Sequence, residues 1–414
     1  MKKDYVVRKK CVLCGSNQLQ KILDFKKTPL ANSYVKSTKI KEKVYPLVCV
    51  ICSNCKHLQL QHLVKPKILF EDYMYVSGTS PVLVKHFENY FRKIKKTLKL
   101  DKSKDKILDI ACNDGTFLNF FVKDKFKNVI GIEPAKNLRF LNKKKKIDIN
   151  TAFFNYKNSF FFKKKYKEFK IITANNVFAH VPNLKDFALG VKNILAEDGL
   201  FIFEVSYLKD VIKKLTFDTI YHEHMSYHSL KPLINFFRSL NLEVLDFDLI
   251  EAQGGSIRVY VGHKGMQIKK NKIKKQIALE KKFGLFSNKT FLKYYKKINL
   301  QKNKIQNLIK RNINQNKIFV GYGAPAKVTT FSHVFEISKK DIRFIVDDNK
   351  LKQGKFTPGK NIKIIKFNDL KKINFNYVII LAWNFSESII KNLKKNIKNK
   401  KYKIIVPFPN LKII

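Results

Sequence analysis

The sequence predicts an α/β protein in three parts: a small N-terminal β module, a parallel α/β sheet and a second α/β domain. Three observations support this prediction. Two Cys-x-x-Cys pairs stand within the first 60 residues, strands and helices alternate from residue 106, and a second alternation begins near residue 317. Alternating strands and helices are typical of parallel sheets. We therefore expect the three parts to span residues 1–72, 73–263 and 264–414.

The composition favours a folded protein with a strong excess of positive charge. The 414 residues are 45% hydrophobic, and the net charge is +52. Such a charge would suit nucleic acid or an anionic surface. However, only seven of the 84 basic side chains are Arg, the residue preferred for bidentate recognition of phosphates and bases. We interpret the charge as a compositional bias and expect no nucleic-acid partner.

The sequence carries no recognisable export or membrane signal. The first ten residues are charged and lack the apolar core of a secretory signal. No run approaches the roughly 20 apolar residues of a membrane-spanning helix. We expect a cytoplasmic protein without a transmembrane segment, as a monomer or a homodimer.

The N-terminal part contains the spacing of a structural zinc site. Cys11 with Cys14 and Cys52 with Cys55 form two Cys-x-x-Cys units, each able to present two thiolates to one tetrahedral zinc ion. Cys49 is also three residues before Cys52, but it falls inside an alternating strand, so Cys52 and Cys55 are preferred. Four Cys ligands leave no open position on the metal, which predicts one structural Zn²⁺ per chain.

The central part begins with a strand, a tight turn and a helix. The apolar run Ile107–Ile110 is typical of a buried parallel strand, and a helix should begin at Thr116. Between them, Gly115 can adopt backbone angles closed to other residues. This arrangement predicts a small ligand at the carboxyl end of the strand, over free backbone N–H groups.

Further elements extend this pattern along the chain. The link between the last two strands of the central part is too short for a crossover helix, so we expect them to pair antiparallel. Strands are predicted at 128–133, 171–176, 200–205, 242–249, 256–262, 317–320, 342–346, 377–382 and 403–406, and helical segments at 82–98, 181–196 and 264–316.

Two loops could hold a nucleotide-like cofactor. Gly321-x-Gly323-x-x-Ala326, with Asp347 downstream, matches a dinucleotide fingerprint and would indicate an NAD-dependent oxidoreductase. In the central part, Glu133 follows the second strand, where an acidic side chain can accept both ribose hydroxyls. A parallel sheet that ends in an antiparallel hairpin is typical of S-adenosylmethionine-dependent methyltransferases, which favours the central loop.

Seven motifs stand in order along the chain, at 107–116, 131–134, 176–182, 221–224, 253–260, 321–327 and 382–385. Together with the N-terminal Cys pairs, this order points to a particular family. The sequence resembles the three-domain sugar C-methyltransferases that act on nucleotide-linked 4-keto-deoxysugars. The resemblance implies a Rossmann-like class I methyltransferase sheet, preceded by a small zinc-binding β module and followed by a second Rossmann-like domain that helps hold the nucleotide sugar.

The resemblance also implies where S-adenosylmethionine binds. Family members usually carry Glu-x-Gly-Ser-Asn-Asp-Gly in the central loop, where this chain has Asp109, Ala111 and Cys112 in the corresponding places. Gln253 stands where His is common, so a His-dependent contact at that position stays open. The cofactor-binding residues implied are Asp109, Ala111, Asn113, Asp114, Gly115, Glu133, Asn175 and Asn176.

The implied reaction transfers a methyl group to a carbon beside a ketone, through an enolate. It needs a general base, donors for the developing oxyanion and close alignment of the reactants. The resemblance implies His224 as the base, with Tyr221 and Glu223 orienting the sugar or the base. In an extended segment Tyr221 and His224 would lie on opposite faces, so a local bend is expected. His180 and Tyr75 match further active-site positions.

Several alternatives remain open at this point. His180 could instead cap the following helix, and Tyr73 is the rival of Tyr75. The acceptor atom could be oxygen or nitrogen on a sugar or lipid precursor, in place of carbon. A zinc-ribbon protein that binds nucleic acid is an alternative of another class.

Overall fold

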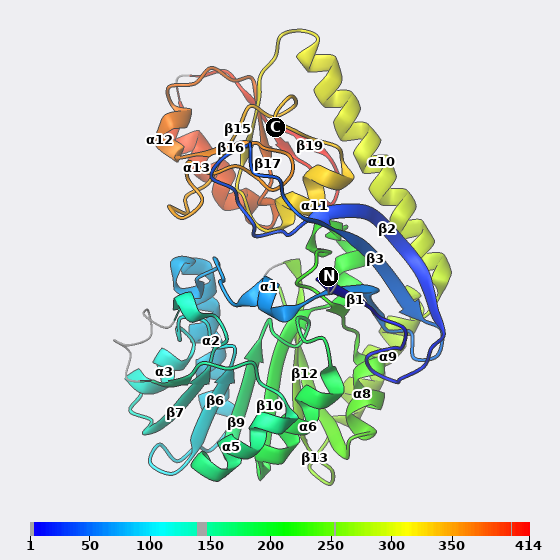
Figure 1. The fold of residues 1–414 in the computed structure, drawn as a ribbon, viewed down its shortest axis with the longest axis vertical. Helices are drawn as coiled ribbons and strands as arrows, with labels where there is room; N and C mark the ends of the chain where they lie inside the picture. The colour runs from blue at the N-terminus through cyan, green and yellow to red at the C-terminus, as the bar shows by residue number, and fades with distance from the viewer. Residues whose placement is uncertain (1–3, 139–146, 252–253, 399) are drawn as a thin grey trace.

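The computed structural model describes residues 4–138, 147–251, 254–398 and 400–414. Gln253 lies outside the described residues, so its motif is followed from Gly254 onward. Two sheets with flanking helices lie one above the other, and the N-terminal strands pass between them (Figure 1). None of the helices in the described ranges is both long enough and apolar enough to cross a membrane.

The central sheet has seven strands in the order β12-β13-β10-β9-β6-β7-β8. Five neighbouring strands from β10 to β8 are parallel, and β13 pairs antiparallel with both β10 and β12. The predicted hairpin and the predicted fold class are confirmed. The strands are β6 (Lys106–Ile110), β7 (Asn128–Ile132), β8 (Asp148–Asn150), β9 (Phe169–Asn175), β10 (Leu195–Ser206), β12 (Leu242–Ile250) and β13 (Ser256–His263).

Helices cover both faces of this sheet. On one face, α2 and α3 bury aromatic side chains such as Phe87 and Phe121 against Ile107 and Ile202. On the other face, α6 and α8 pack against Leu108 and the remaining inward positions. Helix α2 begins where the side chain of Ser80 accepts a hydrogen bond from the Leu83 amide. The helices are α2 (Pro81–Thr97), α3 (Leu118–Lys123), α5 (Tyr156–Tyr166), α6 (Leu184–Ile194), α7 (Leu208–Lys213) and α8 (Leu230–Arg238).

The N-terminal strands form a sheet that a later segment completes. Its order is β11-β4-β3-β2, and β11 comes from Ser226–Tyr227, directly after the Tyr221–His224 motif. The motif is therefore attached to the N-terminal sheet at the level of the backbone. The other elements are β1 (Tyr5–Val7), β2 (Leu19–Pro29), β3 (Val44–Cys52), β4 (Leu58–Leu60), β5 (His62–Val64) and α1 (Pro66–Phe70).

The C-terminal sheet has six strands in the order β16-β15-β14-β17-β18-β19. The predicted helical stretch 264–316 contains two helices, because Gly284 adopts a left-handed conformation (φ +84°) that ends the first. The elements are α9 (Lys270–Phe283), α10 (Asn288–Ile313), β14 (Phe319–Tyr322), α11 (Lys327–Val334), β15 (Phe344–Val346), β16 (Lys363–Ile365), α12 (Phe367–Leu370), β17 (Tyr377–Ile380), α13 (Ser386–Asn396), β18 (Lys403–Val406) and β19 (Lys412–Ile413).

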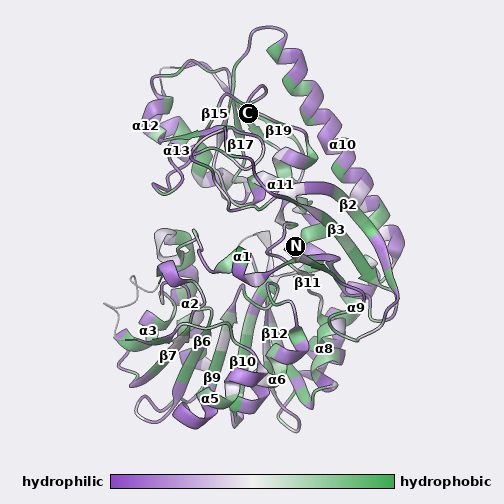
Figure 2. Ribbon diagram, in the orientation of Figure 1, coloured by the Kyte–Doolittle hydropathy of each residue, from purple (hydrophilic) through white to green (hydrophobic). Residues whose placement is uncertain are grey.

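The hydrophobic core of the C-terminal part continues into the N-terminal strands. Leu23 and Leu47 belong to the same buried cluster as Ile298 of α10 and Val320 of β14. Figure 2 shows apolar colour along the strands of both sheets and mostly polar colour along α10. This shared core holds the N-terminal strands against the C-terminal sheet. The domain boundaries stay a prediction.

Candidate active site

A cavity of about 1010 Å³ lies where the three parts meet. Ten residues between Lys65 and Ser80 line it on one side, and the carboxyl ends of β6, β7, β9 and β10 line it from the central sheet. The C-terminal part contributes Lys327, Lys352 and residues 381–385. The cavity lies where parallel α/β sheets usually bind ligands, outside the carboxyl ends of the strands.

The loop after β6 is held in an unusual backbone conformation. Ala111 and Asn113 both have φ of +55°, and Gly115 has φ of +69°. Only the last of these is a glycine, for which such angles carry no steric cost. For a residue with a Cβ atom the left-handed conformation costs about 1–2 kcal/mol. Ala111 therefore adopts this conformation at a cost in conformational free energy that a glycine would not have.

The amides of this loop are mostly occupied within the protein, which corrects the prediction of free N–H groups. Cys112 donates to the carbonyl of Ile132 at 3.0 Å, and Gly115 donates to the carbonyl of Cys112 at 2.9 Å. The Asn113 amide donates to Glu133 Oε2 at 2.7 Å. These bonds form because the loop turns back over β7. A ligand here must be recognised by side chains more than by these three amides.

Asp109 and Asn175 meet at the carboxyl end of neighbouring strands. Thr173 Oγ1 donates to Asp109 Oδ1 at 2.7 Å, and Asn175 Nδ2 donates to the same oxygen at 3.2 Å. Burial raises the pKa of Asp109 to about 7, and the nearby Glu133 carboxylate adds to the effect. Asp109, Asn175 and Asn176 all line the cavity.

Glu133 is fixed at the end of β7. Its two oxygens accept from the amides of Asn113 at 2.7 Å and Ala135 at 2.8 Å, and burial raises its pKa. The side chain lines the cavity together with Ala111. A cavity bordered by Asp109 and Glu133 fits a ligand that carries ribose hydroxyls and positive charge, such as S-adenosylmethionine.

Asn113 and Asp114 use their side chains to hold the segment that enters the central part. Asn113 accepts from the Ser77 amide and donates to the carbonyl of Tyr75, both at 2.9 Å. Asp114 Oδ2 accepts from the Gly78 amide at 3.2 Å. Asn113 lines the cavity, whereas Asp114 and Gly115 shape the loop from behind and are not among the lining residues.

The Tyr221–His224 motif forms the bend that the sequence required. A turn closes with the His224 amide donating to the carbonyl of Tyr221 at 2.9 Å, and Tyr221 Oη lies 3.0 Å from His224 Nε2. His224 Nδ1 lies 2.6 Å from the carbonyl of Thr219, which can only accept, so Nδ1 carries the proton. Burial lowers the pKa of His224 to about 4, so its Nε2 holds a lone pair near neutral pH.

His180 stacks between two rings at the edge of the cavity. Its ring lies 5.0 Å from that of His224 and 5.5 Å from that of Phe70, nearly parallel to each. The Met225 amide donates to the carbonyl of Ala179 at 2.8 Å, which brings the two segments together. Burial, with a contribution from His224, lowers the pKa of His180. His180 lines the cavity. The residue that caps the following helix is Asn183, whose side chain accepts a hydrogen bond from the Asp186 amide.

Glu223 lies behind the cavity surface and organises two side chains that do line it. Asn32 Nδ2 donates to Glu223 Oε1 at 2.7 Å, and Tyr73 Oη donates to Glu223 Oε2 at 3.1 Å. Burial raises the pKa of Glu223 to about 7. Tyr75 also lines the cavity and is 40% exposed, so both tyrosines of the entering segment face the same space.

The sequence did not single out the cationic side chains of the C-terminal part. Lys327 lies with its ammonium 5.5 Å from the Trp383 ring, and Trp383 Nε1 donates to the buried Asp218 at 2.8 Å. Lys352 Nζ donates to the carbonyl of Ala324 at 2.8 Å. Burial lowers the pKa of both lysines. Lys327 ends the 321–327 motif, but that motif assigned no role to its side chain, and no local pattern distinguishes Lys352 among so many lysines.

The Gly321 loop uses its acidic partner for its own turn. Asp347 Oδ2 accepts from the Ala324 amide at 2.6 Å, and Oδ1 accepts from the Asn349 amide at 2.8 Å. Glu133 holds the central loop with the same pair of contacts. The two acidic residues differ in position, because Glu133 lines the cavity and Asp347 is not among the lining residues.

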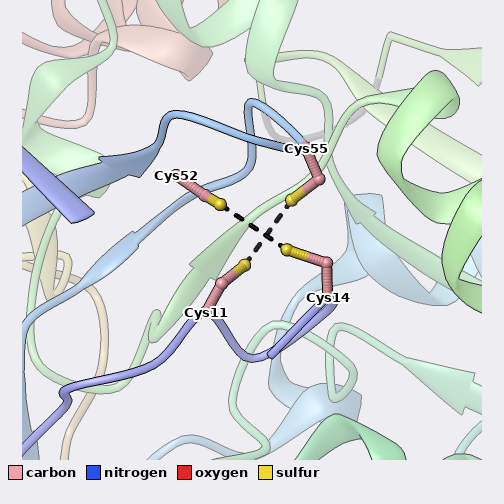
Figure 3. Close-up of side chains that lie close together, drawn as sticks. All are labelled: Cys11, Cys14, Cys52 and Cys55. Atoms are coloured by element: carbon pink, nitrogen blue, oxygen red, sulfur yellow. Dashed lines mark hydrogen bonds between the residues drawn. The ribbon is translucent and has the colours of Figure 1, made fainter. Parts of the chain in front are cut away.

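The four predicted zinc ligands converge from two loops (Figure 3). Cys11 Sγ lies 3.5 Å from Cys55 Sγ, and Cys14 Sγ lies 3.6 Å from Cys52 Sγ. A tetrahedral zinc site with bonds of about 2.3 Å has sulfur–sulfur distances of about 3.8 Å, so the cluster fits this metal. Within the described residues, these four form the one group of three or more side chains that could hold a metal. Cys49 is buried in the neighbouring core, as expected.

Three family models match successive parts of the chain. A "Putative zinc binding domain" matches residues 11–70, a methyltransferase domain matches residues 84–246, and a C-methyltransferase C-terminal domain matches residues 251–409. The matched order is the order of the three parts described above.

Similar proteins also include methyltransferases. The C-methyltransferase NovU of Streptomyces niveus is 29% identical over 407 residues, which cover 98% of this chain and 96% of NovU. Among solved structures, a SAM-dependent methyltransferase from Anabaena variabilis matches with 13% identity and a TM-score of 0.35, over 42% of this chain and 84% of the other. An S-adenosylmethionine-dependent methyltransferase from Clostridium acetobutylicum matches with 16% identity and a TM-score of 0.34, over 43% and 91%.

Proposed function

Because the chain is an S-adenosylmethionine-dependent C-methyltransferase of this three-part family, we propose that it methylates the carbon beside the ketone of a nucleotide-linked 4-keto-deoxysugar. The observation that carries the proposal is the pairing of Tyr221 with His224 at the cavity surface. S-Adenosylmethionine, when bound, supplies an electrophilic methyl group. The protein must then generate a carbon nucleophile next to it.

His224 is suited to remove the proton from the substrate carbon. Its Nδ1–H is committed to the carbonyl of Thr219, so the lone pair of Nε2 remains for proton transfer. The low pKa keeps the free imidazole neutral, and an anionic substrate close by would raise the pKa toward a value better matched to a base. Thr219 then stabilises the imidazolium that forms.

Tyr221 is suited to stabilise the negative charge that develops on the ketone oxygen. Its hydroxyl lies 3.0 Å from His224 Nε2 and could turn from that nitrogen to donate to an enolate oxygen. Tyr73 is held by Glu223 and faces the same cavity, as does Tyr75. We propose that these groups orient the sugar and that His180 confines the imidazole of His224 by stacking on it.

The C-terminal wall supports a nucleotide diphosphate as the carrier. Lys327 and Lys352 bring two buried ammonium groups to the cavity. Asp218 lies near the first and Asp347 near the second, yet burial outweighs these carboxylates and lowers the pKa of both lysines. A diphosphate would compensate both charges. With the nucleobase and phosphates at this wall, the sugar would lie near His224. The cofactor would lie at the central sheet, held by Asp109, Glu133, Asn175 and Asn176.

The first test replaces the proposed base. His224→Ala is expected to reduce methyl transfer by about 10²–10⁴-fold, the usual contribution of a general base. The affinity for S-adenosylhomocysteine, measured by calorimetry, should stay unchanged. His263→Ala is a matched control, because His263 is a half-buried histidine at the end of β13 and is not among the cavity-lining residues.

The substrate and the acceptor atom are tested together. The purified protein is incubated with S-adenosylmethionine and a panel of nucleotide-linked 4-keto sugars, and products are detected by the mass of one added methyl group. NMR of the product distinguishes a C-methyl from an O-methyl signal. Full activity of His224→Ala, or an O-methyl product, would contradict the proposed chemistry.

A further inference from the structure

A buried polar cluster borders the cofactor side of the cavity and has no role in the chemistry described above. Its members are His86 on α2, Glu204 on β10 and Arg258 on β13. Glu204 and Arg258 are each 3% exposed, and His86 is 14% exposed and lines the cavity. Arg258 belongs to the 253–260 motif, which the proposed function does not otherwise use.

The cluster is tightly connected. Arg258 donates to Glu204 Oε2 through Nε at 3.1 Å and Nη2 at 2.7 Å, and its guanidinium lies 3.5 Å from the centre of the Tyr90 ring. His86 Nε2 lies 2.9 Å from Glu204 Oε1. A buried ion pair of this geometry is a rigid support, because separating its charges would leave each without a partner.

The cluster continues a row of polar side chains along the carboxyl edge of the sheet. Asp109 on β6 bonds to Asn175 on β9, Asn175 is in register with Glu204 on β10, and Glu204 is in register with Arg258. Tyr90 lies one helical turn after His86 on α2. Burial raises the pKa of its phenol, and the carboxylates of Glu204 and Asp109 add to this rise. With strands about 4.8 Å apart, the row from β7 to β10 spans roughly 14 Å.

The tautomer of His86 follows from its partner. An ionised carboxylate can only accept, and the Arg258 guanidinium holds Glu204 in its ionised form. Arg258 Nη2 also lies 3.5 Å from His86 Nε2, but the 2.9 Å contact to Glu204 is the shorter one, so the Nε2 proton is assigned to the bond with Glu204. In neutral imidazole Nδ1 is then an acceptor. Within the described part of the chain, no hydrogen bond to this nitrogen is present, although the ring borders the cavity.

We propose that His86, positioned by Glu204 and Arg258, binds the α-ammonium group of the methionine end of S-adenosylmethionine. Glu133 would lie at the ribose end of the same row, and Asp109 between them. An ammonium group can only donate hydrogen bonds, so it needs an acceptor, and His86 Nδ1 is an acceptor at the cavity surface. The inference rests on the dependence on S-adenosylmethionine and is independent of the sugar substrate.

Calorimetry with three ligands tests the assignment on the full chain. The ligands are S-adenosylhomocysteine, its analogue without the α-amino group, and 5′-methylthioadenosine, which lacks the whole amino-acid part. His86→Ala should weaken S-adenosylhomocysteine about 10- to 100-fold, as expected for a hydrogen bond to a charged group. It should leave the affinities for the other two ligands unchanged.

Two further variants sharpen the reading. His86→Gln should retain most of the affinity, because its amide NH₂ can donate to Glu204 while its oxygen faces the cavity. Lys85→Ala is the matched control, since Lys85 is an exposed neighbour on α2 whose ammonium pairs with Glu88. This control should bind all three ligands like the parent protein.

Each remaining outcome would overturn the inference in a recognisable way. Equal weakening of all three ligands by His86→Ala would indicate a packing role. Weakening of both S-adenosylhomocysteine and the deaminated analogue, with 5′-methylthioadenosine unchanged, would indicate a contact to the carboxylate and reject the ammonium assignment. A parent protein that binds no S-adenosylhomocysteine would overturn the cofactor assignment itself. Binding of S-adenosylhomocysteine as proposed, without methylation of any nucleotide-linked sugar, would contradict only the proposed function.

Discussion

At the scale of single residues, burial sets the protonation behaviour of the candidate site. Asp109 and Glu223 are buried carboxyl groups whose pKa values are raised to about 7, whereas His224 has a pKa lowered to about 4. In each case desolvation is the largest cause, because it disfavours the charged form. The site therefore tends toward neutral side chains, which suits the removal of a proton by imidazole.

Glu223 gives a prediction about stability and pH. Its pKa is higher in the folded state than in the unfolded chain, so the stability it contributes is complete below about pH 4. That contribution is lost as the pH rises to about 7. At pH 5 the free energies of unfolding of Glu223→Gln and of the parent protein should be similar. At pH 8 the free energy of unfolding of the variant should be higher than that of the parent protein by about 1–3 kcal/mol.

Urea unfolding at both pH values measures this difference. Glu197→Gln provides the control, because Glu197 is exposed on β10 and should show the same relative stability at both pH values. A Glu223→Gln variant whose relative stability falls between pH 5 and pH 8 would contradict the raised pKa.

At the scale of elements, the loop between β6 and α3 combines strain with precise support. Ala111, Asn113 and Gly115 all have positive φ, while the side chains of Asn113 and Asp114 hold the entering segment. Asn can tolerate the left-handed region through local hydrogen bonds, and glycine has no Cβ atom to clash. Ala111 has neither advantage, so the loop keeps this conformation through its bonds to β7 and to residues 75–78.

Two substitutions in this loop should have opposite effects. Gly115→Ala introduces a Cβ at φ +69° and should lower the free energy of unfolding by about 1–2 kcal/mol. Ala111→Gly removes a Cβ at φ +55° and should raise it by up to about 1 kcal/mol, after the entropy lost by glycine on folding. Thermal and urea unfolding of both variants measure these changes. Equal destabilisation by the two would show that strain does not govern this loop.

At the scale of the whole molecule, the N-terminal part joins the other two. Its sheet accepts β11 from the segment after His224, its core extends to the C-terminal sheet, and Asn32 reaches Glu223. Arg8, three residues before Cys11, donates to the carbonyl of Pro182 at 3.0 Å. A metal site in this part would therefore stabilise the frame around the cavity without entering it.

Zinc content and metal removal test this role. Elemental analysis should find about one zinc per chain, and Cys11→Ser should lower the zinc content, the melting temperature and the yield of soluble protein. The kcat of the remaining folded enzyme should change little, because none of the four cysteines lines the cavity.

Ser53→Ala is the control for this experiment. Ser53 is an exposed residue between Cys52 and Cys55, and its substitution leaves all four thiols in place. Its zinc content should equal that of the parent protein. Parent protein without zinc would contradict the metal assignment.

The sequence by itself determined those features in which chemistry follows from local spacing. Two Cys-x-x-Cys pairs define the metal knuckles, Ile107–Ile110 with Gly115 defines the strand and turn, and the short link before Ser256 requires an antiparallel pair. In these cases the relevant atoms are only a few residues apart, so spacing alone restricts their geometry.

Only the tertiary structure decided which distant side chains share the cavity. His86 meets Glu204 across 118 residues, Asn32 meets Glu223 across 191, and Lys327 reaches the cavity from the last domain. The sequence also missed that the loop amides are occupied, because two of their acceptors, the Ile132 carbonyl and the Glu133 carboxylate, lie at the end of β7, about 20 residues further along the chain. Such contacts depend on how sheets and helices pack, and packing places residues together without any trace in local spacing.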